Sequence, residues 1–311
     1  MTPIPLALSV DVEDWPQSSW DRSLPLSDYC ADNTRRLLDL LGDYRAARAT
    51  FFVLGKFAER HPAVVRAIAE AGHEIGSHGH SHVEIFRLGR ERFAEDLHRS
   101  TDVIAQTAAV RPVGYRAPDF SIVGESLWAL DLLAENGYRY DSSIFPIAKR
   151  RYGIADWPRG PVLVRLSSGG TILELPPATL LWHGRRLAVG GGGYARLIPG
   201  MMLHWALRQA YAQLGAPLVY YCHPYEIDPD EFRRLNLSIP LKVRLHQGLG
   251  RRATAKKLRR LLRQFECLSL GAALDRITDL PVIDPAPYVL DPAAVTRPPI
   301  FEGREPAPPS P

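Results

Sequence analysis

Residues 33–78 read NTRRLLDLLGDYRAARATFFVLGKFAERHPAVVRAIAEAGHEIGSH, and the hydrophobic period changes along this stretch. NTRRLLDLLGDY and PAVVRAIAEAG place apolar residues three and four positions apart, which is typical of amphipathic helices. ATFFVLG and HEIGSH are short apolar runs of the kind that form buried strands. Helices that alternate with such strands predict a parallel sheet or a barrel.

The same alternation extends in both directions from this stretch. PLALSVD precedes it, and the later units are RERFAEDLHRSTDVIAQTA, PVGYRAP, SLWALDLLAENG, YRYDSS, MMLHWALRQAYAQLG and PLVYYCHPYE. Six or so strand and helix units favour an incomplete or distorted barrel over a short doubly wound sheet.

Residues 146–200 interrupt the alternation with WPRGP, SSGG, ELPP and the run GGGG at 190–193, so we expect hairpins and loops there. The glycine run lacks the GK[ST] of a phosphate-binding loop, and a flexible loop is the preferred interpretation. We therefore predict a catalytic domain over 1–228 with an irregular insertion at about 146–200. A basic helical extension follows over 229–280, and a proline-rich tail over 281–311 wraps the surface or is disordered at its end.

Composition limits the classes of protein and partner that fit this chain. It has 311 residues, is 46% hydrophobic and carries a formal charge of +4, which favours a globular α/β protein and does not indicate nucleic acid. No apolar run approaches a membrane span, and MTPIPLALSVDVEDW lacks the pattern of a signal peptide, so we expect a cytoplasmic protein. Cys30, Cys222 and Cys267 lie far apart and are predicted to be buried apolar residues.

Residues 244–265 form the strongest charge cluster, RLHQGLGRRATAKKLRRLLRQF. Its apolar residues Leu258, Leu261, Leu262 and Phe265 fit one side of an amphipathic helix. A solvated helix packed through its leucine side is favoured over a peripheral contact with an anionic inner membrane or a polymer synthase.

Polar side chains follow five of the predicted strands. They are Asp11, Glu13 and Asp14 after ALSV, His78 and His82 after HEIGS, Arg116 after PVGY, Asp141 after YRY, and His223 after LVYYC. The carboxyl ends of parallel strands meet at one rim, where the catalytic groups of such folds gather. Two imidazoles and a carboxylate are ligands that zinc accepts, and this set leaves a position for water.

The histidine segment EIGSHGHSH can be interpreted in two ways. His78 and His82 are four residues apart, which suits one ion if the intervening turn is helical, whereas His80 would point elsewhere as a loop or supporting residue. Alternatively, all three are exposed loop histidines, because HxxxH alone is a weak signal. The acidic residues that follow the first strand favour the metal site.

Five motifs in order give the chain a family resemblance. ALSVDVED, EIGSHGHSH, YRAPDF, YDSSIF and VYYCHP, within about residues 5–226, resemble the motifs of polysaccharide deacetylases of the chitooligosaccharide deacetylase type. GGGGYARLIP, HPYEIDPD and GLGRR resemble a subgroup associated with bacterial exopolysaccharide and exosortase loci. The resemblance implies a distorted (β/α)7-type barrel with an irregular β insertion and a C-terminal helical extension.

The resemblance also implies an activity, which is metal-dependent removal of N-acetyl groups from aminosugars. Its cofactor would be Zn²⁺ or another divalent metal such as Co²⁺ or Ni²⁺, and its substrate a free or lipid-linked N-acetylated oligo- or polysaccharide. By motif, Asp11 would be the general base, paired with Arg116, and His82 with His78 would hold the metal. His223 would protonate the departing amine.

In the family pattern, Asp141 would orient His223. The same pattern has two adjacent aspartates in its first motif, but here Val12 follows Asp11. The metal carboxylate must then be Glu13 or Asp14, and Glu13 is favoured because it shares a face with Asp11 if the strand continues. A metal-free relative that hydrolyses a small cyclic amide, and an inactive carbohydrate-binding scaffold, are the alternative functions.

Four further residues have weaker interpretations. Glu174, at the end of TILE, is expected to have a structural or substrate-loop role. Trp15, Trp182 and Tyr194 could stack on sugar faces, with Trp15 and Tyr194 as the preferred substrate-binding residues, although core packing is the commoner use of an aromatic ring.

Overall fold

The structure is a computed structural model that describes residues 3–147, 149 and 151–295. Its strands are β1 (Ile4–Val12), β2 (Thr50–Val53), β3 (Glu74–Ser77), β4 (Gly114–Tyr115), β5 (Tyr140–Asp141), β6 (Val162–Arg165), β7 (Thr171–Glu174), β8 (Thr179–Trp182), β9 (Arg185–Ala188), β10 (Leu218–Cys222), β11 (Phe265–Leu268) and β12 (Val282–Ile283). Its α-helices are α1 (Asp28–Gly42), α2 (Gly55–Arg60), α3 (Pro62–Glu70), α4 (Ile85–Ala108), α5 (Ala129–Glu135), α6 (Gly192–Leu197), α7 (Gly200–Leu214), α8 (Glu231–Arg234), α9 (Leu241–Gly248), α10 (Arg251–Gln264) and α11 (Leu270–Leu274).

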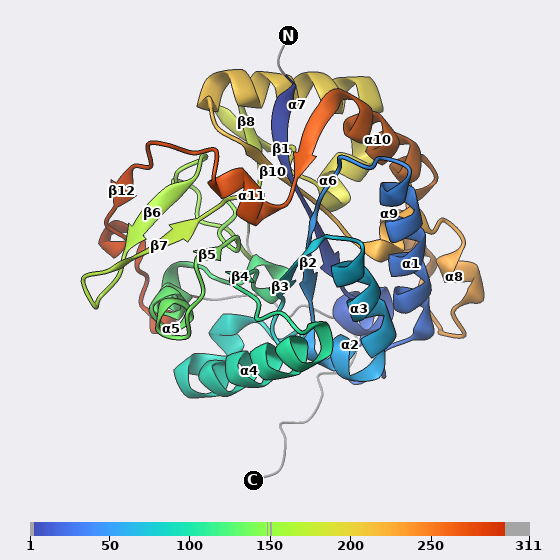
Figure 1. Cartoon of the computed structure of the whole chain (residues 1–311), viewed down its shortest axis with the longest axis horizontal. Coiled ribbons are helices and arrows are strands. Elements are labelled where there is room, and N and C mark those ends of the chain that lie inside the picture. Colours follow the sequence, from blue (N-terminus) through green and yellow to red (C-terminus); the bar gives the residue numbers. More distant parts are fainter. Residues whose placement is uncertain (1–2, 148, 150, 296–311) are drawn as a thin grey trace.

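The predicted alternation of helices and strands is confirmed. In α1 the buried side chains of Cys30, Thr34, Leu37 and Leu41 recur every three or four residues, so one side of the helix packs on the sheet. All four residues of β2 are buried, as expected for a parallel strand covered on both faces. Figure 1 shows the helices arranged around these strands, with α1, α2 and α3 on one side, α4 below and α7 above.

The main sheet closes into the predicted distorted (β/α)7-type barrel. Its neighbouring strands run in the order β10-β1-β2-β3-β4-β5-β7, and all of these pairs are parallel. Closure comes after β7, where Pro177 bridges Val219 of β10 and the Ala178 N–H donates to the Val219 carbonyl at 2.9 Å. Because every barrel strand points the same way, the residues after β1, β3, β4 and β10 meet at one rim.

The irregular stretch 146–200 forms the hairpins that were predicted. β6 and β7 are antiparallel, β8 and β9 form a second antiparallel pair, and the glycine run leads into α6. However, β7 is itself a barrel strand beside β5, so the stretch is not wholly an insertion. The sequence did not show this because β7 is followed by prolines and not by a helix.

The basic segment packs through its leucine side, as predicted. Leu258, Leu261, Leu262 and Phe265 are buried in the same hydrophobic cluster as β1 and β2. β11, which follows α10, pairs in parallel with the first half of β1. Both elements are therefore part of the barrel's packing, and the domain boundaries at 228–229 and 280–281 stay predictions.

Two further expectations concern the cysteines and the tail. All three cysteines are buried and free, as predicted. The described part of the tail lies along the surface, where β12 pairs with β6 and the Leu290 N–H donates to the Gly124 carbonyl at 3.0 Å. The rest of the predicted tail, 296–311, lies outside the described residues. Among the described helices, none combines the length and the apolar character that a membrane crossing requires.

A half-buried histidine makes the stability of this barrel depend on pH. Burial, and then Arg48, lower the pKa of His73 to about 4, and Nδ1 of its neutral ring accepts a hydrogen bond from the Ala49 N–H at 3.4 Å. Between pH 6.5 and 4 the unfolded chain takes up a proton at His73 that the folded chain does not, so acidification favours unfolding. Solvent screening limits this loss to about 1–2 kcal/mol.

We expect His73→Asn to flatten the pH dependence of stability. The free energy of unfolding, measured by urea denaturation at pH 7.5 and pH 4.5, should differ less between the two conditions in the variant than in the parent chain. His98, exposed on α4, supplies the matched control His98→Asn. An unchanged pH dependence in His73→Asn would show that His73 titrates alike in both states.

Candidate active site

The first strand brings two of the predicted carboxylates to the rim. β1 ends at Val12, and Asp11 and Glu13 point inward on either side of that residue, whose side chain lies in the hydrophobic core. Asp11 and Glu13 are both almost fully buried and both line a cavity of about 130 Å³ at the rim. His78 and His223 line the same cavity.

Glu13, His78 and His82 form a cluster that could hold a metal ion. One ligand atom from each of these buried residues lies within 4.8 Å of the others. His82 Nε2 is 2.5 Å from Glu13 Oε2. His78 Nδ1 is 2.7 Å from the Arg116 carbonyl, and because a carbonyl only accepts, Nδ1 carries the proton and Nε2 keeps a lone pair for a cation.

The chain between the two histidines is not a helical turn, so that expectation is wrong. Gly79 and His82 have φ angles of 76° and 56°, which reverse the chain directly after β3. His80 does not reach the cluster, as predicted. Its side chain is buried against Gly55, and its N–H donates to Asp96 Oδ2 at 2.7 Å. The alternative of exposed loop histidines is wrong for all three residues, because each is buried.

Asp11 is paired with Arg116 inside the barrel. Arg116 Nη1 donates to Asp11 Oδ1 and to Ser9 Oγ, each at 2.7 Å. The guanidinium is fully buried, lies 4.4 Å from the centroid of the Phe52 ring, and donates its other hydrogens to the Ser142 carbonyl and hydroxyl. These contacts leave Asp11 Oδ2 on the His223 side, 4.0 Å from its Nε2.

His223 follows β10 and lies between two carboxylates. Its Nε2 is 2.8 Å from Glu13 Oε1, and its Nδ1 is 3.3 Å from Glu226 Oε2. Burial alone would lower the pKa of His223, but Glu13 and Glu226 together raise it to about 10. Burial would likewise raise the pKa of Glu13, yet His82 and His223 hold it well below its usual range. The ring therefore carries a proton that it can donate.

Glu226 and Arg196 are site residues that the sequence reasoning missed. Glu226 lies three residues after His223, in the short 3-10 turn Pro224–Ile227, and its Oε1 pairs with Arg196 Nη1 at 3.3 Å. Both are buried. The signal in the sequence was the i, i+3 spacing of His and Glu in HPYE, but nothing local links them to Arg196, thirty residues earlier.

Asp141 does not orient His223, so its predicted role is wrong. Among the described residues it has no contact with His223, because β5 lies beside β7, where the register places Asp141 opposite Glu174. Burial raises the pKa of both carboxyls, that of Glu174 well above its usual range, so Glu174 is protonated and donates to Asp141. Ser143 Oγ also donates to Asp141, at 2.5 Å. The pair is structural.

Asp14 and Trp15 also lie away from the cluster. Asp14 accepts hydrogen bonds from the Ser27 N–H at 2.8 Å and the Ser27 hydroxyl at 2.6 Å, and so holds the residue that precedes α1. Trp15 is fully buried against Trp20 and Phe232, so its prediction as a sugar-stacking residue is wrong. The reason is that the chain turns after Glu13 and directs the next two side chains into the protein.

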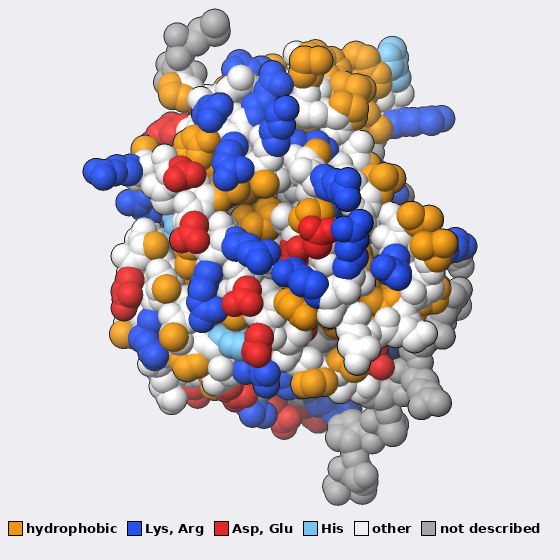
Figure 2. All heavy atoms as spheres, turned by 90° about the vertical axis from the view of Figure 1, so that its right-hand side faces the viewer, with side chains coloured by type: hydrophobic (Ala, Val, Ile, Leu, Met, Phe, Trp, Pro, Cys, Tyr) orange, Lys and Arg blue, Asp and Glu red, His pale blue; other side chains and the backbone are white. Residues whose placement is uncertain are grey.

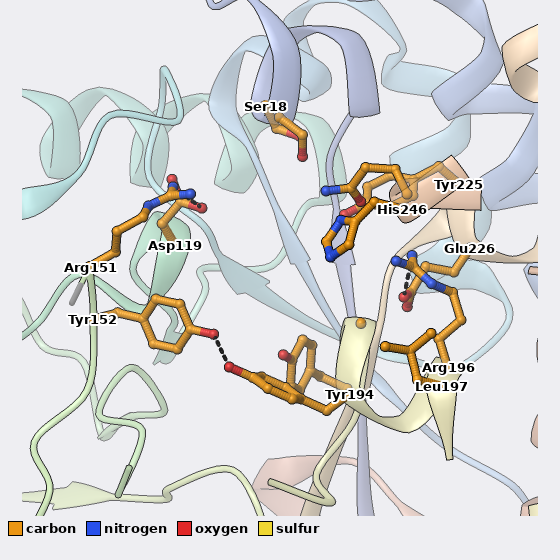
Figure 3. Close-up of a pocket in the computed structure, with 14 residues that line it drawn as sticks. Ser18, Asp119, Arg151, Tyr152, Tyr194, Arg196, Leu197, Tyr225, Glu226 and His246 are labelled. Atoms are coloured by element: carbon orange, nitrogen blue, oxygen red, sulfur yellow. Dashed lines mark hydrogen bonds and ion pairs between the residues drawn. The ribbon is translucent and has the colours of Figure 1, made fainter. Parts of the chain in front are cut away.

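A larger groove of about 370 Å³ adjoins the rim cavity and shares Asp119, Tyr152, Tyr221 and Tyr225 with it. Figure 3 shows the hydroxyls of Tyr152 and Tyr194 facing each other at 2.6 Å, with the Arg196–Glu226 pair beyond them. Tyr194 is thus placed where a substrate-binding residue was predicted. Trp182 lines neither this groove nor the rim cavity.

Family models divide the chain into two parts. Residues 19–140 match the model described as polysaccharide deacetylase, and residues 142–275 match a domain of unknown function, DUF3473. The second match includes the hairpins, α6, α7, β10 and the basic helix, and thus contains His223 and Glu226.

Curated relatives are similar over part of their length. The chain is 31% identical over 99 residues to the peptidoglycan-N-acetylglucosamine deacetylase of Bacillus cereus, which covers 32% of this chain and 36% of that protein. It is 32% identical over 103 residues to the chitooligosaccharide deacetylase of Sinorhizobium fredii, covering 32% of this chain and 44% of the other. The chain therefore spans less than half the length of these relatives.

Solved structures share the fold over most of the chain. A Mycobacterium smegmatis protein named "putative polysaccharide deacetylase" matches with a TM-score of 0.60 at 21% identity, covering 91% of this chain and 98% of that one. An allantoinase matches with a TM-score of 0.56 at 16% identity, covering 88% and 89%. Through residues 19–140 the chain belongs to the polysaccharide deacetylase family, and it continues into a domain of the unknown-function family.

Proposed function

We propose that this chain hydrolyses the N-acetyl amide of an acetylated aminosugar, with a divalent cation as cofactor, in bacterial exopolysaccharide or cell-surface polysaccharide metabolism. The observation that carries the proposal is the convergence of Glu13, His78 and His82 beside the Asp11–Arg116 pair and His223. The names of the relatives support the substrate class, since two of them are deacetylases of N-acetylated glycans.

The three clustered side chains fit a cation such as Zn²⁺. Burial lowers the pKa of His78, so its ring is neutral, and Nε2 offers a lone pair. His82 Nδ1 is buried and has no hydrogen-bond partner among the described residues, and Glu13 supplies the carboxylate. Two imidazoles and one carboxylate are a common zinc ligand set in hydrolases. When bound, the cation would act as a Lewis acid toward the acetyl carbonyl and would acidify a water molecule.

Asp11 and His223 would move the protons of the reaction. Asp11 Oδ2 faces the cavity and would accept a proton from the attacking water, while Arg116 holds the other carboxylate oxygen. His223 carries a proton on the ring and would give it to the sugar nitrogen as the C–N bond breaks. The water oxygen ends on the acetyl carbon, so the products are acetate and a free aminosugar.

Removal of the metal tests this proposal. Acetate release from N-acetylglucosamine oligomers should fall to the level of the blank after treatment with a chelator, and should return when Zn²⁺ or Co²⁺ is added back. Full turnover of a small cyclic amide by metal-free protein would instead identify a metal-independent amidohydrolase. Glycan binding with no acetate, in fully metal-loaded protein, would identify an inactive scaffold.

Glu226→Gln tests how His223 is oriented. Gln keeps the shape of the side chain but lacks the charge that pairs with His223 Nδ1 and with Arg196. Because Glu226 lies beyond the reacting atoms, we expect kcat for acetate release to fall roughly 10- to 100-fold while KM and the bound metal content stay unchanged. Glu95→Gln, on the exposed side of α4, is the control. A kcat equal to that of the parent chain would exclude this positioning role.

A further inference from the structure

Several large apolar side chains are exposed around the start of α7. They are Trp182 of β8, Leu197 of α6, and Met201, Met202 and Trp205 of α7. Met201 and Met202 are 71% and 59% exposed, and the Trp182 and Trp205 rings pack edge to face at 5.0 Å. Soluble proteins seldom leave so many large apolar side chains together in water, so this patch indicates a binding surface.

Helix α9 continues this patch. None of its residues is buried, and Leu241, Leu245 and Leu249, four residues apart along the chain, are each more than 60% exposed. Gly250, next to Leu249, packs on the backbone of Arg196, which is next to Leu197. The exposed leucines of α9 therefore adjoin the exposed residues of α6.

The same elements carry positive charge and hardly any negative charge. The sequence contains no Asp or Glu over residues 175–225 or over residues 241–264, and the second range carries nine Lys and Arg residues. Lys242 and Arg244 of α9 and Lys256 and Arg260 of α10 are exposed. In the upper right of Figure 2, hydrophobic side chains lie beside Lys and Arg, and no Asp or Glu is visible.

These elements form one continuous surface. α7 packs on β8, and α10 packs on α6. Lys257 of α10 donates to the carbonyls of Ala195 and Arg196 at 3.1 and 2.7 Å, and it lies beside Gly200 at the start of α7. We call the exposed side chains of β8, β9, α6, α7, α9 and α10 the cationic apolar surface.

We propose that the cationic apolar surface binds the surface of an anionic lipid bilayer. Exposed Trp, Met and Leu side chains can enter the boundary between headgroups and acyl chains, while the surrounding Lys and Arg side chains pair with lipid phosphates. A polysaccharide fits less well, because Met and Leu offer no planar ring on which a sugar could stack. Leu197 and Tyr194 also line the groove beside the rim cavity, so a bound bilayer would lie next to the mouth of the site.

Co-sedimentation of the full chain with lipid vesicles tests the proposal. We expect binding to vesicles of equal parts phosphatidylcholine and phosphatidylglycerol, and weak binding to phosphatidylcholine alone. Added salt should weaken the binding to anionic vesicles, since it screens the charges. Met201→Ser with Met202→Ser should reduce that binding by about tenfold, because both side chains would leave the bilayer boundary.

Two further double variants separate the apolar part from the charged part. Leu245→Ser with Leu249→Ser should reduce binding by about tenfold at every salt concentration. Lys256→Glu with Arg260→Glu should reduce it by about thirtyfold at low salt and much less at high salt. All six substitutions lie at exposed positions, so the fold should be retained, which circular dichroism will check.

Matched controls change the same residue types elsewhere. Val110→Ser with Val289→Ser removes two exposed apolar side chains, and Arg90→Glu with Arg92→Glu reverses two exposed charges on α4. Neither control should alter vesicle binding. Acetate release from soluble oligomers should be unchanged in the surface variants, so this proposal and the proposed function can fail separately.

Three results would overturn the proposal. The first is equal binding of the parent chain to neutral and anionic vesicles, or binding to neither. The second is a loss of binding in the control variants as large as in the surface variants. The third is self-association of the parent chain in sedimentation velocity that the surface variants abolish, since the surface would then be an interface between copies of the chain.

Discussion

Asp11→Asn is expected to lower kcat for acetate release by about a thousandfold, within the range for loss of a general base. Asn has the size of Asp and can still accept the Arg116 hydrogen bond through its oxygen, so the fold and the rim should be preserved. It cannot accept a proton from water at the oxygen that faces His223. KM should therefore change little, because the loss concerns the transition state and not substrate binding.

Asp102→Asn is the control for this variant, because Asp102 is exposed on α4 and the substitution is chemically the same. Initial rates on N-acetylated oligomers, at saturating Zn²⁺, give kcat and KM for each protein. A kcat for Asp11→Asn within a factor of about three of the parent value would reject Asp11 as the base, because it corresponds to less than 1 kcal/mol of barrier.

The second large effect is expected at the metal cluster, where Glu13→Gln should weaken binding of Zn²⁺ a hundredfold or more. Loss of groups that only support metal ligands costs about 10- to 100-fold in affinity, and loss of a ligand should cost at least as much. Glu13 Oε2 contacts His82 Nε2, and an amide oxygen brings no charge to that position. Competition titration with a zinc-binding dye measures the affinity, and acetate release should fall with it.

Asp14→Asn is the matched variant, since it changes the neighbouring carboxylate in the same way. Asp14 accepts hydrogen bonds from Ser27, and Asn can still accept one of them, so metal affinity should stay at the parent value. The opposite outcome, with affinity lost in Asp14→Asn and kept in Glu13→Gln, would move the metal carboxylate to Asp14 and contradict the arrangement described above.

Local patterns were sufficient to predict the elements and the rim. The three- and four-residue spacing predicted α1, α3 and α7, and the apolar runs predicted β1, β2 and β10. Each of these signals lies within one element, where periodicity reports burial directly. The motif after β1 also narrowed the metal carboxylate to two residues, of which the strand's alternation favoured Glu13.

Relations between strands could not be predicted in this way. Asp141 was expected beside His223, because both follow strands of the same rim. The sheet register instead pairs Asp141 with Glu174, whereas β1 and β10 are neighbours, so Asp11 and His223 meet. Register depends on contacts between segments that are distant in sequence, and no local period reports it.

By itself, the sequence determined the alternating α/β architecture, the set of ionisable groups at the strand ends and the leucine side of the basic helix, because each depends on residues within a few positions of one another. Only the tertiary structure decided that Glu226 and Arg196 support His223, that Trp15 is buried, and that the exposed residues of α6, α7 and α9 form one surface. These outcomes depend on which side chains closure of the barrel brings together, since burial and charge pairing between distant segments exist only in the folded chain.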